Sequence, residues 1–173
     1  MRINIWAGPG AGKSNLVPLI YRELNLDGFN TELVTEFIKK WAYENKKPQS
    51  YDQLYIFSKQ LNTEDVFLRS GVDHIVTDSP VPMQIYYSRK NKDPFWEHLR
   101  DIALAFEKKN PSLNIFLDRT GIPYRQNGRY ENEEQAIQVD KEMYEFMQEI
   151  TGQNNKFRTI DTAEILTFIK ENI

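Results

Sequence analysis

The chain has 173 residues, of which 40% are hydrophobic and 13% aromatic, and its formal net charge is −3. This length and composition indicate one folded domain over residues 1–173 and exclude a disordered chain, while the mild negative charge argues against a large nucleic-acid-binding surface. With no cysteine and no apolar run of about 18 residues, we expect no disulfide, thiolate metal site, leader or membrane span, and a cytoplasmic location.

The first predicted strand, residues 2–6, leads directly into the glycine-rich segment 7–14, which reads AGPGAGKS. Its glycines allow positive φ angles and let backbone N–H groups surround phosphate oxygens. Lys13 would reach the β- and γ-phosphates, and Ser14 would offer its hydroxyl to Mg²⁺ at the start of a helix. We therefore expect a nucleoside triphosphate to contact Gly8, Gly10, Ala11, Gly12, Lys13, Ser14 and Asn15.

The rest of the chain alternates between helical and strand-like patterns. The predicted helices span 13–24, 36–45, 51–70, 83–90, 94–109 and 133–150, with a last helix capped by Asp161 and Glu164. The other predicted strands span 30–34, 74–77, 113–117 and 157–160. This alternation predicts a parallel sheet covered by helices on both faces, a three-layer α/β/α fold with its ligand site beyond the carboxyl ends of the strands.

Two carboxylates follow predicted strands. Asp78 ends the strand at 74–77, where it could hold Mg²⁺ opposite Ser14 or simply cap the next turn. Glu36 follows the strand at 30–34, where it could accept the proton of an attacking hydroxyl. Alternatively, Glu36 is only a favourable negative charge in the first turn of a helix.

The polar segment 118–132 is rich in arginine and predicts a loop or lid. Guanidinium groups on a closing loop stabilise the charge of a transferring phosphoryl group, and closure excludes water. We expect Arg125 or Arg129 to contact phosphate, although exposed loops often carry arginine for solubility alone.

Four residues of the predicted helix 51–70 share one stripe at spacings of four, seven and eleven: Gln53, Phe57, Gln60 and Glu64. Amide groups can pair with the edge of a nucleobase while an aromatic ring stacks on it, and Trp41 could add a wall. The first three residues and Trp41 are therefore candidate substrate contacts. The same stripe is equally compatible with a half-buried helix face.

Together these segments resemble the P-loop nucleoside and nucleotide kinases, and within them the ribosylnicotinamide-kinase-like ATPase domains, a group with many bacteriophage proteins. The matching segments are 7–14, 35–37, 53–61, 76–80 and 128–129. The resemblance implies a five-stranded parallel sheet in the order 2-3-1-4-5, an arginine-bearing lid, ATP and Mg²⁺. It also implies functional positions for Glu36, facing the acceptor, and for Asp78 and Arg129. The aspartate frequent in such lids is missing from 126–129, QNGR.

These observations predict a kinase that transfers the γ-phosphoryl group of ATP to a hydroxyl of a nucleoside, a nucleotide or a modified base. The start of the helix near Glu36 is similar to deoxynucleoside kinases, and related phage kinases act on modified pyrimidines within DNA. Lys13, Glu36, Arg125 and Arg129 are the candidate catalytic residues. The alternative is a nucleotide-dependent ATPase or switch acting on a protein partner. The sequence does not identify the acceptor or the oligomeric state. If the protein is encoded by a phage, its cytoplasmic location is that of the host.

Overall fold

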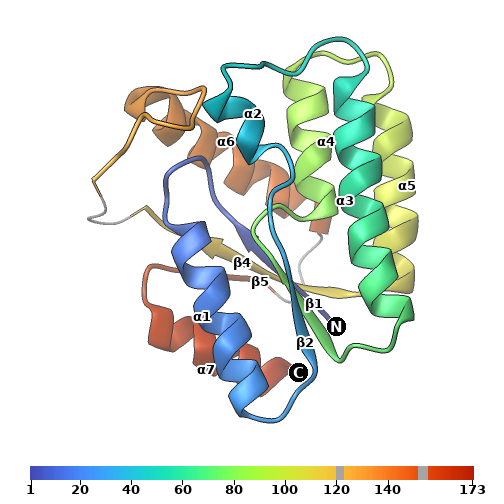
Figure 1. The fold of residues 1–173 in the computed structure, drawn as a ribbon, viewed down its shortest axis with the longest axis vertical. Helices are drawn as coiled ribbons and strands as arrows, with labels where there is room; N and C mark the ends of the chain where they lie inside the picture. Colours follow the sequence, from blue (N-terminus) through green and yellow to red (C-terminus); the bar gives the residue numbers. More distant parts are fainter. Residues whose placement is uncertain (120–122, 152–155) are drawn as a thin grey trace.

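The computed structural model describes residues 1–119, 123–151 and 156–173 (Figure 1). Residues 120–122 of the predicted lid lie outside the described residues. The strands are β1 (Arg2–Trp6), β2 (Thr31–Val34), β3 (His74–Thr77), β4 (Ser112–Leu117) and β5 (Lys156–Thr159). The helices are α1 (Lys13–Leu26), α2 (Lys39–Tyr43), α3 (Asp52–Arg69), α4 (Val81–Lys90), α5 (Trp96–Lys109), α6 (Glu133–Thr151) and α7 (Thr162–Asn172).

The five strands form one parallel sheet in the order β2-β3-β1-β4-β5. The central strand β1 pairs with β3 and β4 in a register that places Ile3 opposite Val76 and Leu113. Every residue of β1, β3 and β4 is buried, as a parallel sheet with both faces covered requires. The predicted fold class and strand order are confirmed.

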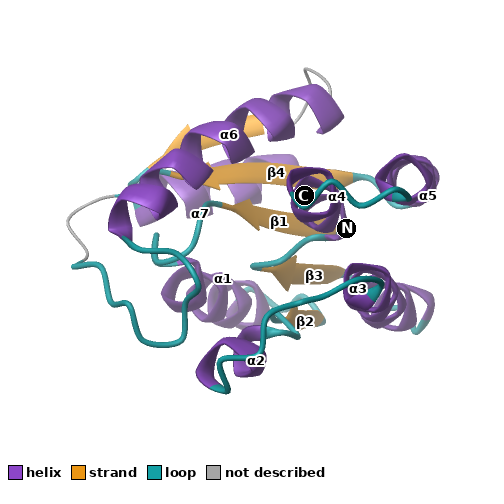
Figure 2. Ribbon diagram, turned by 90° about the horizontal axis from the view of Figure 1, so that it is seen from above, coloured by secondary structure: helices purple, strands orange, loops and turns teal. Residues whose placement is uncertain are grey.

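Helices cover the sheet on both sides (Figure 2). One face packs against α1 and α7 through a cluster that includes Ile5, Ile20 and Ile165, all fully buried. The opposite face packs against α3 to α6 through larger side chains, including Trp6 and Phe116. The short helix α2 stands apart from these layers, next to the loop that precedes α6 (Figure 1). Within the described ranges, no helix combines the length and apolar character that a membrane span needs.

The helix predicted over 36–45 is shorter in the structure. Residues 35–38 form a loop and turn, and α2 begins only at Lys39. The reason is a tertiary contact: the backbone N–H of Glu36 donates to Oδ1 of Asp78 over 2.9 Å. This bond holds the chain across the end of β3 before it turns into the helix. Glu36 therefore lies in a loop and not in the first helical turn.

A buried ion pair connects the beginning of β1 to α3. Arg2 is fully buried, and its Nε donates to Oε2 of Glu64 over 2.9 Å. Its Nη1 donates to Glu107 over 2.7 Å. Glu64 in turn accepts from Nε2 of Gln60 over 2.8 Å and from the N–H of Val81 over 3.1 Å. The far half of the α3 stripe is therefore occupied by structural hydrogen bonds.

Candidate active site

The glycine-rich loop connects β1 to α1 at the carboxyl end of the central strand. Gly10 and Gly12 have φ angles of +78° and +102°, a left-handed conformation that favours glycine. The side chain of Lys13 folds back over the loop, and its Nζ donates to the carbonyl oxygens of Ala7 (2.6 Å) and Gly8 (3.0 Å). Burial lowers the pKa of Lys13 below its usual value. A loop of this shape at a helix N-terminus fits a bound phosphate chain.

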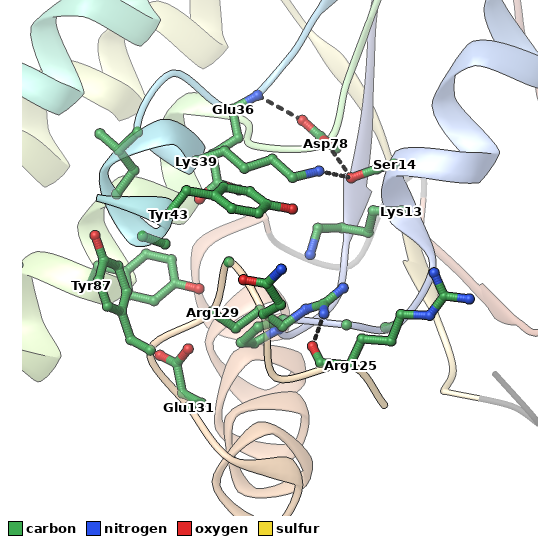
Figure 3. A pocket seen from close by; sticks show the side chains of 18 of the residues that line it. Lys13, Ser14, Glu36, Lys39, Tyr43, Asp78, Tyr87, Arg125, Arg129 and Glu131 are labelled. Atoms are coloured by element: carbon green, nitrogen blue, oxygen red, sulfur yellow. Dashed lines mark hydrogen bonds between the residues drawn. The ribbon is translucent and has the colours of Figure 1, made fainter. Parts of the chain in front are cut away.

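The loop forms one wall of a pocket of about 690 Å³ (Figure 3). The other walls come from the segment after β2 with α2, from α3 and α4, and from residues of the lid. Phosphate-binding residues and an open space beside them therefore share one cavity. A volume of this size holds a small organic molecule.

Two oxygen ligands approach each other beside the loop. The hydroxyl of Ser14 donates to Oδ2 of Asp78 over 3.4 Å, and Asp78 is only 5% exposed. Lys39 reaches the same point, and its Nζ donates to Oγ of Ser14 over 3.1 Å. The ammonium of Lys39 therefore lies beside the contact between the Ser14 hydroxyl and the Asp78 carboxylate.

This arrangement fits Mg²⁺, which is bound through one or two protein oxygens together with phosphate oxygens and water. Across the described residues, no cluster of three or more histidine, cysteine or acidic side chains could hold a metal alone. A site made of Ser14, Asp78 and a bound triphosphate matches the donor set that is present.

Glu36 lines the pocket and is exposed to it. Desolvation raises the pKa of Glu36 above its usual value, and the positive charge of Lys13 opposes that effect. Lys39 and Asp78 act on it in opposite directions. A carboxylate with a raised pKa, facing a phosphate-binding loop, is suited to accept a proton.

Residues 123–132 of the predicted lid form one wall of the pocket. A Cβ atom on Gly10 would lie 2.7 Å from Cε2 of Tyr124 and 3.2 Å from Nε of Arg129, so both residues cover the phosphate loop. On the other side, Gly128 packs tightly against the ring of Tyr43, which belongs to α2. The lid therefore bridges the phosphate loop and α2.

Both predicted lid arginines line the pocket. Nη1 of Arg129 donates to the backbone carbonyl of Arg125, and the hydroxyl of Tyr130 donates to the carbonyl of Lys46. The guanidinium of Arg129 also lies 5.4 Å from the ring centre of Tyr124. Aromatic and backbone contacts therefore hold these lid residues against the pocket.

The end of the pocket away from Lys13 is lined by amide and phenol groups. Nε2 of Gln53 donates to Oε1 of Gln84 over 3.2 Å, and Nε2 of Gln84 donates to Oγ of Ser79 over 2.8 Å. Tyr87 lines the same space, where burial raises the pKa of its phenol well above the usual value. These groups are neutral hydrogen-bonding partners close to a cavity wall.

The sequence pattern of the AAA domain family matches residues 2–162. The chain belongs to this AAA domain family. Among solved structures, two of the M. mycoides deoxyadenosine kinase are similar to this AAA domain, one with products dCMP and a flexible dCDP and one with dATP. Each gives a TM-score of 0.59 at 17% identity, covering 99% of this chain and 97% or 98% of the other.

A structure named APE1195 is also similar, with a TM-score of 0.54 and 14% identity over 100% of this chain and 96% of that one. At these identities the likeness concerns the fold. No curated protein matches the sequence.

Three predicted substrate contacts of the AAA domain do not line the pocket: Trp41, Phe57 and Gln60. Phe57 is 1% exposed in the core, and Gln60 is bonded to Glu64 and Thr77. The reason for the two α3 residues is burial: Phe57 packs in the core, and the amide of Gln60 is held behind the cavity wall by Glu64 and Thr77. Only the first residue of the predicted stripe reaches the pocket.

Trp41 is placed differently from the expectation as well. Its ring lies 6.4 Å from that of Phe37 and 3.5 Å from the ammonium of Lys46. It supports α2 from the side that does not face the cavity.

Truncation of Phe57 should mainly reduce stability, whereas truncation of Gln53 should mainly weaken substrate binding. Phe57→Ala should lower the free energy of unfolding by about 3–5 kcal/mol, because it opens a cavity in the core. Gln53→Ala should lower the free energy of unfolding by only about 1–2 kcal/mol, because the buried amide loses two hydrogen bonds to Gln84, and should raise the acceptor KM about tenfold. Chemical denaturation and steady-state kinetics measure the two effects. Equal effects of the two variants on the acceptor KM would contradict the assignment.

The sequence interpretation missed Lys39, Gln84 and Tyr87 as pocket residues. Lys39 follows Glu36 by three positions, a spacing that could have drawn attention to it. Gln84 and Tyr87 come from α4, and only the packing of α4 beside α3 brings them to the pocket.

Proposed function

We propose that this AAA domain is a Mg-ATP-dependent kinase that phosphorylates a hydroxyl of a free nucleoside or nucleotide. The observation that carries this proposal is the shared cavity: the phosphate loop and the carboxylate of Glu36 face the same space under one lid. An ATPase or switch needs the phosphate loop and can use a carboxylate to activate water, but it has no use for the further pocket space lined by Gln53, Gln84 and Tyr87.

On the phosphate side, the amides of the loop and Lys13 would bind the triphosphate of ATP. Ser14 and Asp78 would hold Mg²⁺, which supplies neutralisation of the phosphate charge. Lys39 lies 3.1 Å from the Ser14 hydroxyl and would turn its ammonium to the γ-phosphate when the triphosphate binds. Arg125 and Arg129 of the lid would stabilise the equatorial oxygens of the transferring group.

On the acceptor side, Glu36 would accept the proton of the attacking hydroxyl. The acceptor oxygen then forms a bond to the γ-phosphorus as the bond to the β,γ-bridging oxygen breaks, and ADP leaves. Closure of the lid over Gly10 and against Tyr43 keeps water from replacing the acceptor.

The choice of a nucleoside-type acceptor rests on the end of the pocket beside Tyr87, whose lining also includes the carboxylate of Glu131 (Figure 3). Gln53, Gln84 and Tyr87 offer amide and hydroxyl groups of the kind that pair with the edge of a nucleobase. The similar M. mycoides structures, of a deoxyadenosine kinase with dCMP and dCDP or with dATP bound, support a nucleoside-type acceptor.

The test is transfer of label from γ-labelled ATP to a panel of free nucleosides, nucleotides, ribosylnicotinamide and DNA containing hydroxymethylpyrimidines. We expect label in a free nucleoside or nucleotide. Label only in DNA would replace the acceptor class, and release of phosphate without any acceptor would favour the switch.

Lys39→Met should lower kcat/KM for transfer by about tenfold to a hundredfold, because a charge-assisted hydrogen bond to phosphate contributes roughly 1.5–3 kcal/mol. Lys40→Met is the matched control, since Lys40 is an exposed neighbour on α2 that does not line the pocket. Unchanged kinetics in Lys39→Met would remove Lys39 from the site.

A further inference from the structure

We infer that Arg119 and Asp140 form a positioning pair that fixes the phosphate loop. In this pair the positive charge of Arg119 balances the negative charge of the Asp140 carboxylate beside the loop. The inference rests on the proposed binding of a nucleoside triphosphate. Neither residue lines the pocket, so both act through the loop and not on the substrate.

Asp140, on α6, reaches both the loop and Arg119. Its Oδ1 accepts the backbone N–H of Gly8 over 2.6 Å, and its Oδ2 accepts Nε of Arg119 over 2.8 Å. Arg119 completes the connection, because its Nη2 donates to the carbonyl oxygen of Pro9 over 2.7 Å. The pair therefore binds two consecutive residues of the loop, one through a donor and one through an acceptor. Each side chain is only 15% exposed.

Close packing at Gly8 shows how tightly α6 and the loop fit. A Cβ atom at this position would lie 2.5 Å from Oδ1 of Asp140 and 3.0 Å from the carbonyl oxygen of Ala136. Ala136 is fully buried on α6. Any side chain at Gly8 would push the loop off α6 and break the bond to Asp140.

The negative charge of Asp140 interacts electrostatically with Lys13 in the phosphate site. It is among the acidic groups that raise the pKa of Lys13 against the effect of burial, while Arg119 acts in the opposite sense. An unpaired carboxylate at this point would repel a triphosphate, and Arg119 cancels that repulsion. Arg119 holds this position although its buried Nη1 has no hydrogen-bond partner within the described ranges.

Arg119 also extends the arrangement to the lid. Its Cζ lies 5.7 Å from the ring centre of Tyr124, and Cζ of Arg129 lies 5.4 Å from the same ring. The ring of Tyr124 thus connects the positioning pair with an arginine that lines the pocket.

A double-mutant cycle on the full chain tests the pair by measuring the Kd of a non-hydrolysable ATP analogue by calorimetry. Arg119→Met should raise the Kd at least about tenfold, because it leaves Asp140 charged and unpaired. Asp140→Asn should have a smaller effect, since the amide oxygen can still accept the N–H of Gly8. The variant with both substitutions should bind more tightly than Arg119→Met, because the unpaired charge is gone, but more weakly than the wild type, because the bond to Pro9 is lost. Arg119→Lys, which keeps the charge but cannot reproduce both guanidinium bonds, should bind more tightly than Arg119→Met and more weakly than the wild type.

Arg89→Met is the matched control. Arg89 forms an exposed ion pair with Glu149, with 2.9 Å between Nη1 and Oε2, and it does not line the pocket. It should leave the Kd unchanged. A double variant that binds no better than Arg119→Met would overturn the charge-neutralising role, as would wild-type affinity in Arg119→Met. A wild-type protein that binds no nucleotide would instead overturn the proposed function on which the inference rests.

Discussion

Lys13→Ala should reduce phosphoryl transfer by at least about a thousandfold, because its ammonium lies within the loop where a triphosphate would bind. In the structure the ammonium of Lys13 lies against the carbonyl oxygens of Ala7 and Gly8, and bound phosphates offer it better acceptors. The positive charge disfavoured by burial becomes favourable once a triphosphate lies beside it. Initial rates with saturating ATP measure the effect.

The control for this variant is Lys108→Ala, which removes an exposed lysine on α5 far along the chain from the loop. Circular dichroism of both variants should match that of the wild type. Transfer at more than a tenth of the wild-type rate in Lys13→Ala would contradict the position given to ATP.

Glu36→Gln should lower kcat by about 10²–10⁴-fold and leave the Kd of ATP nearly unchanged. Glutamine keeps the size and polarity of the side chain but cannot take a proton from the acceptor. The backbone N–H of Glu36 still donates to Asp78, so the loop after β2 should keep its place. Single-turnover kinetics measure the chemical step, and calorimetry measures ATP binding.

Glu32→Gln is the matched control for Glu36→Gln, because Glu32 lies on β2 and does not line the pocket. Full transfer activity in Glu36→Gln would show that another group takes the proton. A loss of ATP binding equal to the loss of turnover would instead give Glu36 a structural part in the nucleotide site.

The phosphate loop could be predicted from the sequence because its chemistry is local. The glycines, Lys13 and Ser14 are consecutive, and their spacing alone fixes which atoms face a phosphate. Asp78 and Glu36 could also be brought together, since the carboxyl ends of neighbouring parallel strands meet at one edge of the sheet. The strand order itself came from the family resemblance.

Other parts of the site depend on packing that one sequence does not reveal. The stripe on α3 has helical spacing whether it faces a ligand or a core, and burial in the core separates Phe57 from Gln53, which lines the pocket. Arg119 reads like the other arginines of the lid, yet it binds Pro9 and Asp140. Its partner is 21 residues away on α6, and no local pattern joins them.

The most direct test of the central claim is the partition of label from γ-labelled ATP between a free nucleoside and inorganic phosphate, with wild type and Glu36→Gln measured together. A kinase with the acceptor pocket described above should place most of the label in the nucleoside product, and Glu36→Gln should abolish that product. Label found only in inorganic phosphate, at the same rate with and without nucleosides, would contradict it.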